Sequence, residues 1–174
     1  YLDKTRIPLK IDISTGDVIT PCEISFSYQL MFENRTIPLL AYPPETVLAE
    51  KLETILSRGE ANTRLRDFYD VYILQREDFV VTPDALRYAL LATCRKRGHE
   101  DLLHTYASIL DRVRQSDTMR TQWMKYQSDF DYAAGITWDT VLDTVETLCI
   151  KTLDDHAFGD ELPQEESQFE MHLL

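Results

Sequence analysis

A change in hydrophobic spacing at Pro43-Pro44 constrains the fold of this 174-residue chain more than any other feature. Ahead of the two prolines, apolar and polar residues alternate over 7–13 and 23–33, and a similar segment follows over 36–42. Alternation with a period of two is typical of strands that bury one face, and Asn34-Arg35 fits the tight turn of a hairpin. This part of the chain predicts a small, mostly antiparallel sheet.

Beyond the two prolines the apolar residues follow helical spacing, and proline itself is favourable in the first turn of a helix. Glycine and proline breaks delimit the segments, with Thr82 and Thr137 as predicted N-caps. The predicted helices span 45–57, 64–76, 83–97, 100–114, 117–132 and 137–153. The fold class is therefore α+β, with a sheet over 1–43 followed by a C-terminal helical bundle over 44–153.

Residues 154–174 hold seven acidic side chains and neither lysine nor arginine. They contribute a large part of the net charge of −12 and predict a solvated, mobile acidic tail. The preceding 153 residues hold 23 acids and 18 bases, so the body of the chain is only mildly acidic. That balance still permits a phosphate-bearing substrate at a local basic site.

The three cysteines, Cys22, Cys94 and Cys149, are widely spaced and predict reduced, mostly buried thiols of a cytoplasmic protein. No run approaches the roughly 18 apolar residues of a membrane helix, so no membrane association is expected. The chain begins without methionine, just ahead of a strand-like segment. This start indicates the C-terminal part of a longer protein.

Ile11-Asp12-Ile13 places a carboxylate on the polar face of a predicted strand. Rigid strands hold carboxylates at the spacing that Mg²⁺ ions need in phosphoryl-transfer sites, so Asp12 is a candidate metal ligand. The alternative is a polar residue on the open face of a half-buried strand.

Lys51 falls inside the apolar arc of the predicted helix 45–57, at about 100° of rotation per residue. Glu50 and Glu53 fall on the opposite, polar side. Burial of an unpaired ammonium group is energetically costly, so the position of Lys51 in the apolar arc requires an explanation. Two interpretations remain open: a lysine whose stem is packed while its amine reaches water or a carboxylate, or an amine aimed at nucleotide phosphates.

Asp67 and Asp70 lie three residues apart on a helix whose remaining side chains are mostly apolar. Two carboxylates in such surroundings must meet cations, and Lys51 is among the nearest in sequence. We therefore predict that the Lys51 amine lies within salt-bridge distance of Asp67 or Asp70. The cluster is either a structural clamp between two helices or a site in which an aspartate orients Lys51 or moves a proton.

Three other groups favour structural interpretations. His99 and His104 do not share a helical face, so a metal pair is not expected. The cations of 95–97 could contact RNA, but the end of a helix favours cations by itself. Packing against the core is preferred over a role as base-stacking platforms for four aromatic side chains: Trp123, Tyr126, Tyr132 and Trp138.

Taken together, these segments resemble the AbiEii/AbiGii family of bacterial toxins, nucleotidyltransferases of the DNA-polymerase-β-like superfamily. The resemblance is carried by "ETVLAEKLETILSR", by "RLRDFYDVYIL" shortly after it, and by the strand bearing "KIDIS". "TQWMKYQSDF" and the closing helix are also similar to the family's C-terminal bundle. The resemblance covers roughly residues 7–153 and is most specific over 45–74.

The resemblance implies a role for each candidate residue. Asp12 matches the strand-borne third carboxylate, which would bind Mg²⁺, and Lys51 matches the essential lysine at the nucleotide phosphates. Asp67 and Asp70 match the acidic motif on the following helix, and either one can be the catalytic residue. The residues that would help to hold phosphates are Arg58 and Arg66.

The implied function is that of a toxin in a type IV toxin–antitoxin or abortive-infection system against phage. It would transfer a nucleotide from an NTP, with GTP as a candidate, to an acceptor such as tRNA, and a cognate antitoxin would be its partner. The family's first motif is a Gly-Ser or Gly-Gly turn followed by two carboxylates, and no glycine here is followed by serine or glycine. We therefore expect this chain to be an inactive fragment. The alternative is a non-catalytic helical interaction module with a structural Lys/Asp cluster.

Overall fold

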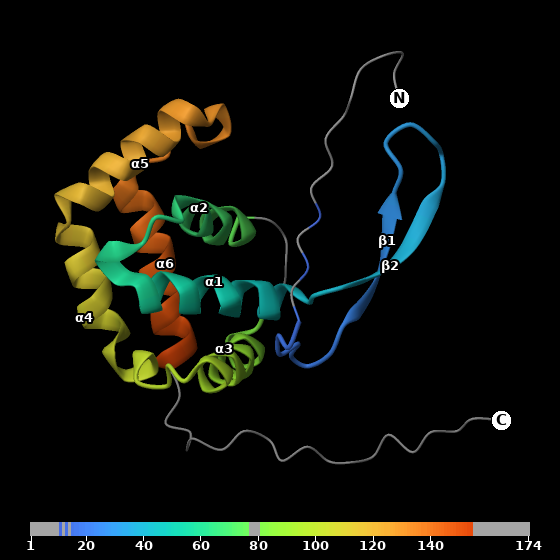
Figure 1. Cartoon of the computed structure of the whole chain (residues 1–174), viewed down its shortest axis with the longest axis horizontal. Coiled ribbons are helices and arrows are strands. Elements are labelled where there is room, and N and C mark those ends of the chain that lie inside the picture. Colours follow the sequence, from blue (N-terminus) through green and yellow to red (C-terminus); the bar gives the residue numbers. More distant parts are fainter. Residues whose placement is uncertain (1–10, 12, 14, 77–80, 155–174) are drawn as a thin grey trace.

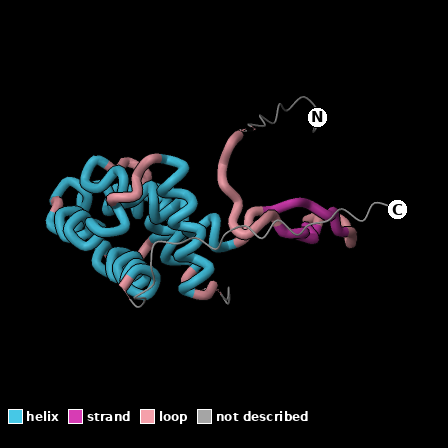
Figure 2. Tube along the Cα trace, turned by 90° about the horizontal axis from the view of Figure 1, so that it is seen from below, coloured by secondary structure: helices cyan, strands magenta, loops and turns pink. Residues whose placement is uncertain are grey.

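The computed structural model describes residues 11–154, apart from 12, 14 and 77–80. The described part begins with an antiparallel hairpin of two strands, β1 (Ile24–Gln29) and β2 (Thr36–Ala41). Two views of the chain show the hairpin at one end of the molecule, extending away from the helices (Figures 1 and 2). The predicted hairpin is confirmed, although the first strand ends four residues earlier than its apolar pattern, at Gln29 instead of residue 33.

One face of the hairpin is apolar across both strands. The register places Ile24, Phe26 and Tyr28 opposite Ala41, Leu39 and Ile37, while serine and glutamine side chains lie on the other face of β1. Both strands are exposed along nearly their whole length. Within the described residues, nothing covers the apolar face, so this sheet contributes little to the core.

The predicted strand over 7–13 lies largely outside the described residues. Ile11 and Ile13 are described, and both are exposed and outside any strand. The prediction of a strand is therefore wrong at these two positions. An alternating pattern shows that a segment could form a strand with one apolar face. The strand is buried only if another part of the protein packs against that face.

Helices make up the rest of the described chain. The bounds are α1 (Pro44–Arg58), α2 (Leu65–Leu74), α3 (Pro83–Arg97), α4 (Leu102–Gln115), α5 (Asp117–Asp129) and α6 (Trp138–Leu153), with short 3₁₀ turns η1 (Gly59–Ala61) and η2 (Asp131–Ala133). The side chains of Thr82 and Thr137 accept hydrogen bonds from backbone N–H groups of α3 and α6, as predicted. The α+β architecture is thus a small sheet followed by a helical bundle.

Helix α1 occupies the middle of the bundle. Figure 1 shows it between α2 and α3, both of which it contacts, and α6 passes behind it in this view. Its apolar residues Leu48, Leu52 and Ile55 are fully buried, and Phe68 of α2 and Trp123 of α5 belong to the same core. Because α1 is enclosed on two flanks, the charged side chains on those flanks must find partners on the neighbouring helices.

The described residues form no helix that is long and apolar enough to cross a membrane. The three cysteines are free thiols; Cys94 and Cys149 are buried, whereas Cys22 is exposed. The prediction of mostly buried thiols therefore holds for two of the three. The predicted acidic tail falls on residues outside those described, apart from Asp154.

Candidate functional site

The connection between α1 and α2 determines which side chains can meet. Gly59 ends α1 with a φ of +49°, a conformation that favours glycine over residues with a Cβ. The buried Asn62 then accepts a hydrogen bond through its Oδ1 from the Arg64 backbone N–H, at 2.7 Å. This local bond prepares the start of α2 at Leu65. The short connection places the first turns of α2 beside the middle of α1.

Lys51 lies between the two predicted aspartates. Its Nζ is 2.6 Å from Asp70 Oδ2 and 3.3 Å from Asp67 Oδ1, so the predicted salt bridge is confirmed with both partners. The side chain of Asp67 is 3% exposed, that of Lys51 19% and that of Asp70 23%. An ammonium group has three N–H donors, and two of them are directed at these carboxylates. One donor is left for a further ligand.

Two arginines of the α2 start join the same group. Arg64 reaches both oxygens of Asp67, with Nε 2.8 Å from Oδ2 and Nη2 3.3 Å from Oδ1. Arg66 lies 3.8 Å from Asp70 Oδ2, and most of its side chain is exposed. We call these five residues the Lys51 cluster. The deeply buried Asp67 is balanced by two cations, while Arg66 keeps its guanidinium at the surface.

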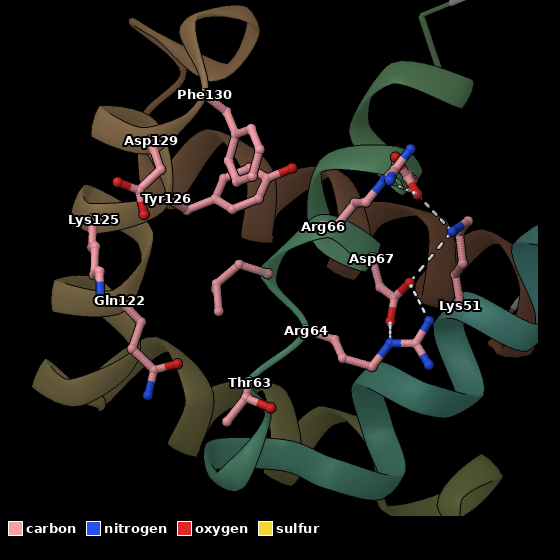
Figure 3. Close-up of a pocket in the computed structure, with 12 residues that line it drawn as sticks. Lys51, Thr63, Arg64, Arg66, Asp67, Gln122, Lys125, Tyr126, Asp129 and Phe130 are labelled. Carbon is pink, nitrogen blue, oxygen red and sulfur yellow. Dashed lines mark hydrogen bonds and ion pairs between the residues drawn. The ribbon is translucent and has the colours of Figure 1, made fainter. Parts of the chain in front are cut away.

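A cavity of about 730 Å³ opens beside the Lys51 cluster, between the start of α2 and helix α5 (Figure 3). This volume lies within the range of about 300–1,000 Å³ that is common for small-molecule sites. We call it the α2–α5 cavity. The five cluster residues line one side of it together with Thr63 and Leu65. The α5 side is lined by Gln122, Lys125, Tyr126, Asp129 and Phe130.

A second cavity, of about 550 Å³, lies over α1, and we call it the α1 cavity. It shares Lys51, Arg64 and Asp67 with the α2–α5 cavity, so the Lys51 cluster borders both. Arg58, the predicted phosphate ligand at the end of α1, is exposed and lines only the α1 cavity. Asp12, the predicted metal ligand, lies outside the described residues.

The α1 cavity also borders a second charged group, centred on Glu53. This carboxylate is 2% exposed, and its two oxygens contact the Arg97 guanidinium and, at 2.7 Å, His99 Nδ1. Glu50 adds a longer contact to Arg97, at 3.7 Å. We call these four residues the Glu53 cluster. The prediction of a polar side of α1 at Glu53 is wrong, because α3 and the turn after it cover that side.

The interpretation of residues 95–97 as cations at the end of a helix is confirmed, since all three lie in the last turn of α3, and Arg97 is in addition paired with Glu53. Burial by itself would lower the pKa of Arg97, but the hydrogen bond and charge of Glu53 outweigh it and raise that pKa. Partial burial raises the pKa of Glu50, with the charge of Arg97 acting against the increase. The Glu53 cluster therefore joins α1 to α3 through a buried carboxylate.

The α5 side of the large cavity was not predicted as part of a site. Trp123 and Tyr126 are buried, as expected for packing residues, and the Tyr126 hydroxyl lies 2.9 Å from that of Tyr132. Tyr132 itself is half exposed. The pattern available in the sequence was the spacing of the cavity-lining residues, which are i, i+3, i+4 and i+7 on one face of α5, followed by Phe130 directly after the helix: Gln122, Lys125, Tyr126 and Asp129.

Within the described ranges, no three histidine, cysteine, aspartate or glutamate side chains gather closely enough to hold a metal ion. Asp67 and Asp70 each face cations, which is the opposite of the surroundings that a metal-binding carboxylate needs. The described residues thus fit anionic ligands better than Mg²⁺.

An enclosed lysine flanked by aspartates thus borders a cavity that has an arginine at its edge. Comparison with family models gives the class of this protein: residues 1–144 match the nucleotidyl transferase AbiEii toxin of the type IV toxin–antitoxin system. The chain therefore belongs to the AbiEii family, whose members are nucleotidyltransferase toxins paired with an antitoxin. No curated protein and no solved structure gave a significant match.

Proposed function

We propose that this protein transfers a nucleotide from an NTP, with GTP as the first candidate, to an RNA acceptor such as tRNA. The observation that supports the proposal most directly is the position of the Lys51 amine, which borders two cavities at once. A transferase must bring two substrates to one reacting centre. Two cavities that share Lys51, Arg64 and Asp67 provide adjoining space for both of them.

In the proposed reaction, a hydroxyl oxygen of the acceptor bonds to the α-phosphorus of the NTP while the bond from that phosphorus to pyrophosphate breaks. The hydroxyl proton passes to a carboxylate, a role for which Asp12 is the candidate. Lys51 and Arg66 offset negative charge on the phosphates as it shifts toward the leaving pyrophosphate. Asp67, nearly without solvent access, orients the Lys51 amine.

Mg²⁺ belongs to this proposal through Asp12 and through the family's first motif. When bound, the ion would polarise phosphate oxygens and offset their charge. The described residues supply cations to the same site instead of metal ligands. Since no glycine in the 174 residues is followed by serine or glycine, we expect this chain alone to bind Mg²⁺ and nucleotide weakly.

The test uses a protein that contains this chain together with the family's first motif, incubated with each labelled NTP and total RNA. We expect label in RNA from the wild-type protein and none from Lys51→Ala, while toxicity in growing cells is lost in parallel. Lys96→Ala, which removes an exposed lysine of α3, is the matched control. A folded Lys51→Ala protein that keeps full transfer activity and toxicity would show that the cluster is a helix clamp only.

A further inference from the structure

The α5 side of the α2–α5 cavity has a chemistry of its own. Figure 3 shows Tyr126 and Phe130 extending from α5 across the cavity from Lys51 and Arg64. Phe130 lines the cavity and is 41% exposed, so part of its ring is accessible from the cavity. This ring therefore offers apolar, flat surface to whatever occupies the cavity.

Other aromatic rings hold Phe130 in place. Its ring centroid lies 4.7 Å from that of Tyr126 and 5.3 Å from that of Tyr132, and the second pair is stacked at an interplanar angle of 30°. Tyr132 in turn lies 4.8 Å from Tyr69 of α2. A ring supported in this way loses little freedom when another flat group packs on it, so the cost of ordering it is low.

Polar side chains around this ring remain available. Within the described part of the chain, the side chains of Gln122, Lys125 and Asp129 make no hydrogen bond or ion pair, although all three line the cavity. A glutamine amide offers both donors and acceptors, lysine offers donors and aspartate offers acceptors. Together they match the mixed donor and acceptor edge of a nucleobase.

The cavity is thus cationic at one end and aromatic at the other. A nucleotide has the complementary form, with anionic phosphates at one end and a flat base at the other. We propose that the α5 wall, formed by Phe130, Tyr126 and Gln122, binds the nucleobase of a nucleotide whose phosphates lie against Arg64, Arg66 and Lys51. This inference rests on the proposed function and adds a site for the base to it.

The shared chemistry is a nucleobase next to phosphate, and two sources can supply it: the NTP or the terminal nucleotide of the RNA acceptor. A stacked base is worth roughly 1–3 kcal/mol by alanine substitution, which corresponds to about 5- to 150-fold in affinity. Inorganic tripolyphosphate has the charge of the NTP but no base. Comparing the two probes separates the contribution of the wall from that of the cations.

The experiment titrates the full 174-residue chain with GTP, ATP, CTP, UTP, inorganic tripolyphosphate and a short single-stranded RNA, followed by NMR so that weak binding is measurable. We expect Phe130→Ala to lower the affinity for the NTPs or for the RNA roughly tenfold, while the affinity for tripolyphosphate stays unchanged. Phe130→Trp, which keeps an aromatic ring, should restore binding. Arg66→Ala should weaken every probe.

Tyr88→Ala is the matched control, because it removes an exposed aromatic ring from α3 that lines neither cavity. A loss confined to the NTPs assigns the base of the donor to the wall, and a loss confined to RNA assigns the base of the acceptor. Unchanged affinity of the folded Phe130→Ala protein for both overturns the inference. The titration measures binding and needs no catalytic turnover. Its result can therefore be interpreted even if the assay of nucleotide transfer shows no activity.

Discussion

Helix α1 carries a charged cluster on each flank, and the two clusters have opposite polarity. In the Lys51 cluster, the α1 residue is a cation between two carboxylates of α2. In the Glu53 cluster, the α1 residue is a carboxylate between a guanidinium and an imidazole contributed by α3 and the turn that follows it. Both clusters join α1 to a neighbouring helix, so the ion pairs alone do not distinguish a site from a clamp.

Access to solvent distinguishes them. Glu53 is 2% exposed and has both oxygens engaged, so it has no capacity for a ligand. The Lys51 amine borders both cavities and has a donor to spare. A buried ion pair costs desolvation and often adds little net stability, but breaking one is expensive. The comparison therefore predicts loss of activity when the Lys51 cluster is changed and loss of stability when the Glu53 cluster is changed.

The largest expected effect is on the rate of nucleotide transfer in Asp67→Asn. This change removes the charge that faces both Lys51 and Arg64, so the amine loses its orientation toward the phosphates. We expect transfer to fall by roughly two orders of magnitude or more, as is common when one charge-stabilising group is lost. Labelled-NTP incorporation by the protein that includes the first motif measures the rate, and circular dichroism checks the fold. Transfer within twofold of wild type would break the comparison.

The next effect is on stability in Glu53→Gln. The amide keeps the shape of the carboxylate but leaves Arg97 and His99 without its charge. Since those two partners are partly exposed and can regain water, we expect a loss of about 2 kcal/mol in the free energy of unfolding. Urea denaturation measures it, with Glu60→Gln as the surface control and an expected change below about 0.5 kcal/mol.

A smaller effect tests whether the two clusters are independent. Lys51→Ala is expected to cost at most a few kcal/mol in stability, because Asp67 retains Arg64 and Asp70 is partly solvated. If the clusters act separately, the double variant Lys51→Ala/Glu53→Gln should equal the sum of the single changes within about 0.5 kcal/mol. A larger deviation in urea denaturation would mean that α1 transmits strain between its two flanks.

The smallest effect concerns thiol reactivity beside the Glu53 cluster. Burial, followed by the charge of Glu53, raises the pKa of Cys94 to about 12, and burial raises that of Cys149 to about 12. Below pH 9 both thiols thus stay protonated and unreactive in the folded state. At pH 8 we expect a thiol reagent to label Cys22 rapidly and the buried pair slowly.

Glu53→Gln should increase labelling of Cys94 a few-fold more than that of Cys149, because only Cys94 lies on the helix that the cluster holds. Equal acceleration of both would indicate a global loss of stability instead of a local opening of the α1–α3 contact.

The raised pKa values also have a consequence for stability. The thiols ionise more readily in the unfolded chain than in the folded one. The contribution of the buried, protonated thiols to the free energy of unfolding is therefore complete below about pH 9 and is lost as pH rises toward 12.

The sequence predicted the Lys51 cluster well because its logic is local. The helical spacing of α1 placed Lys51 in the apolar arc, and a short connection ensured that the nearest carboxylates were those of α2. The hairpin was equally accessible, since alternation and a turn specify it without reference to distant residues. The helix bounds followed from breakers and caps.

The Glu53 cluster and the α5 wall could not be predicted from the sequence, because both depend on contacts between residues that lie far apart along the chain. Glu53 meets residues 44 and 46 positions further along the chain, and helical spacing on α1 cannot reveal which helix covers its polar side. Phe130 and Gln122 become cavity residues only because α5 faces the start of α2. The sequence shows that these residues share one side of the predicted helix over 117–132, but it does not show that the start of α2 lies opposite them.

The closeness of the two clusters along α1 also bears on how this chain can change in length. Only Leu52 separates Lys51 from Glu53, so the two side chains point roughly 200° apart around the helix axis. Inserting or deleting one residue at that point would turn one cluster by about 100° and detach it from its neighbouring helix. We expect homologous chains to vary in length at the hairpin turn between β1 and β2, and to keep α1 without gaps.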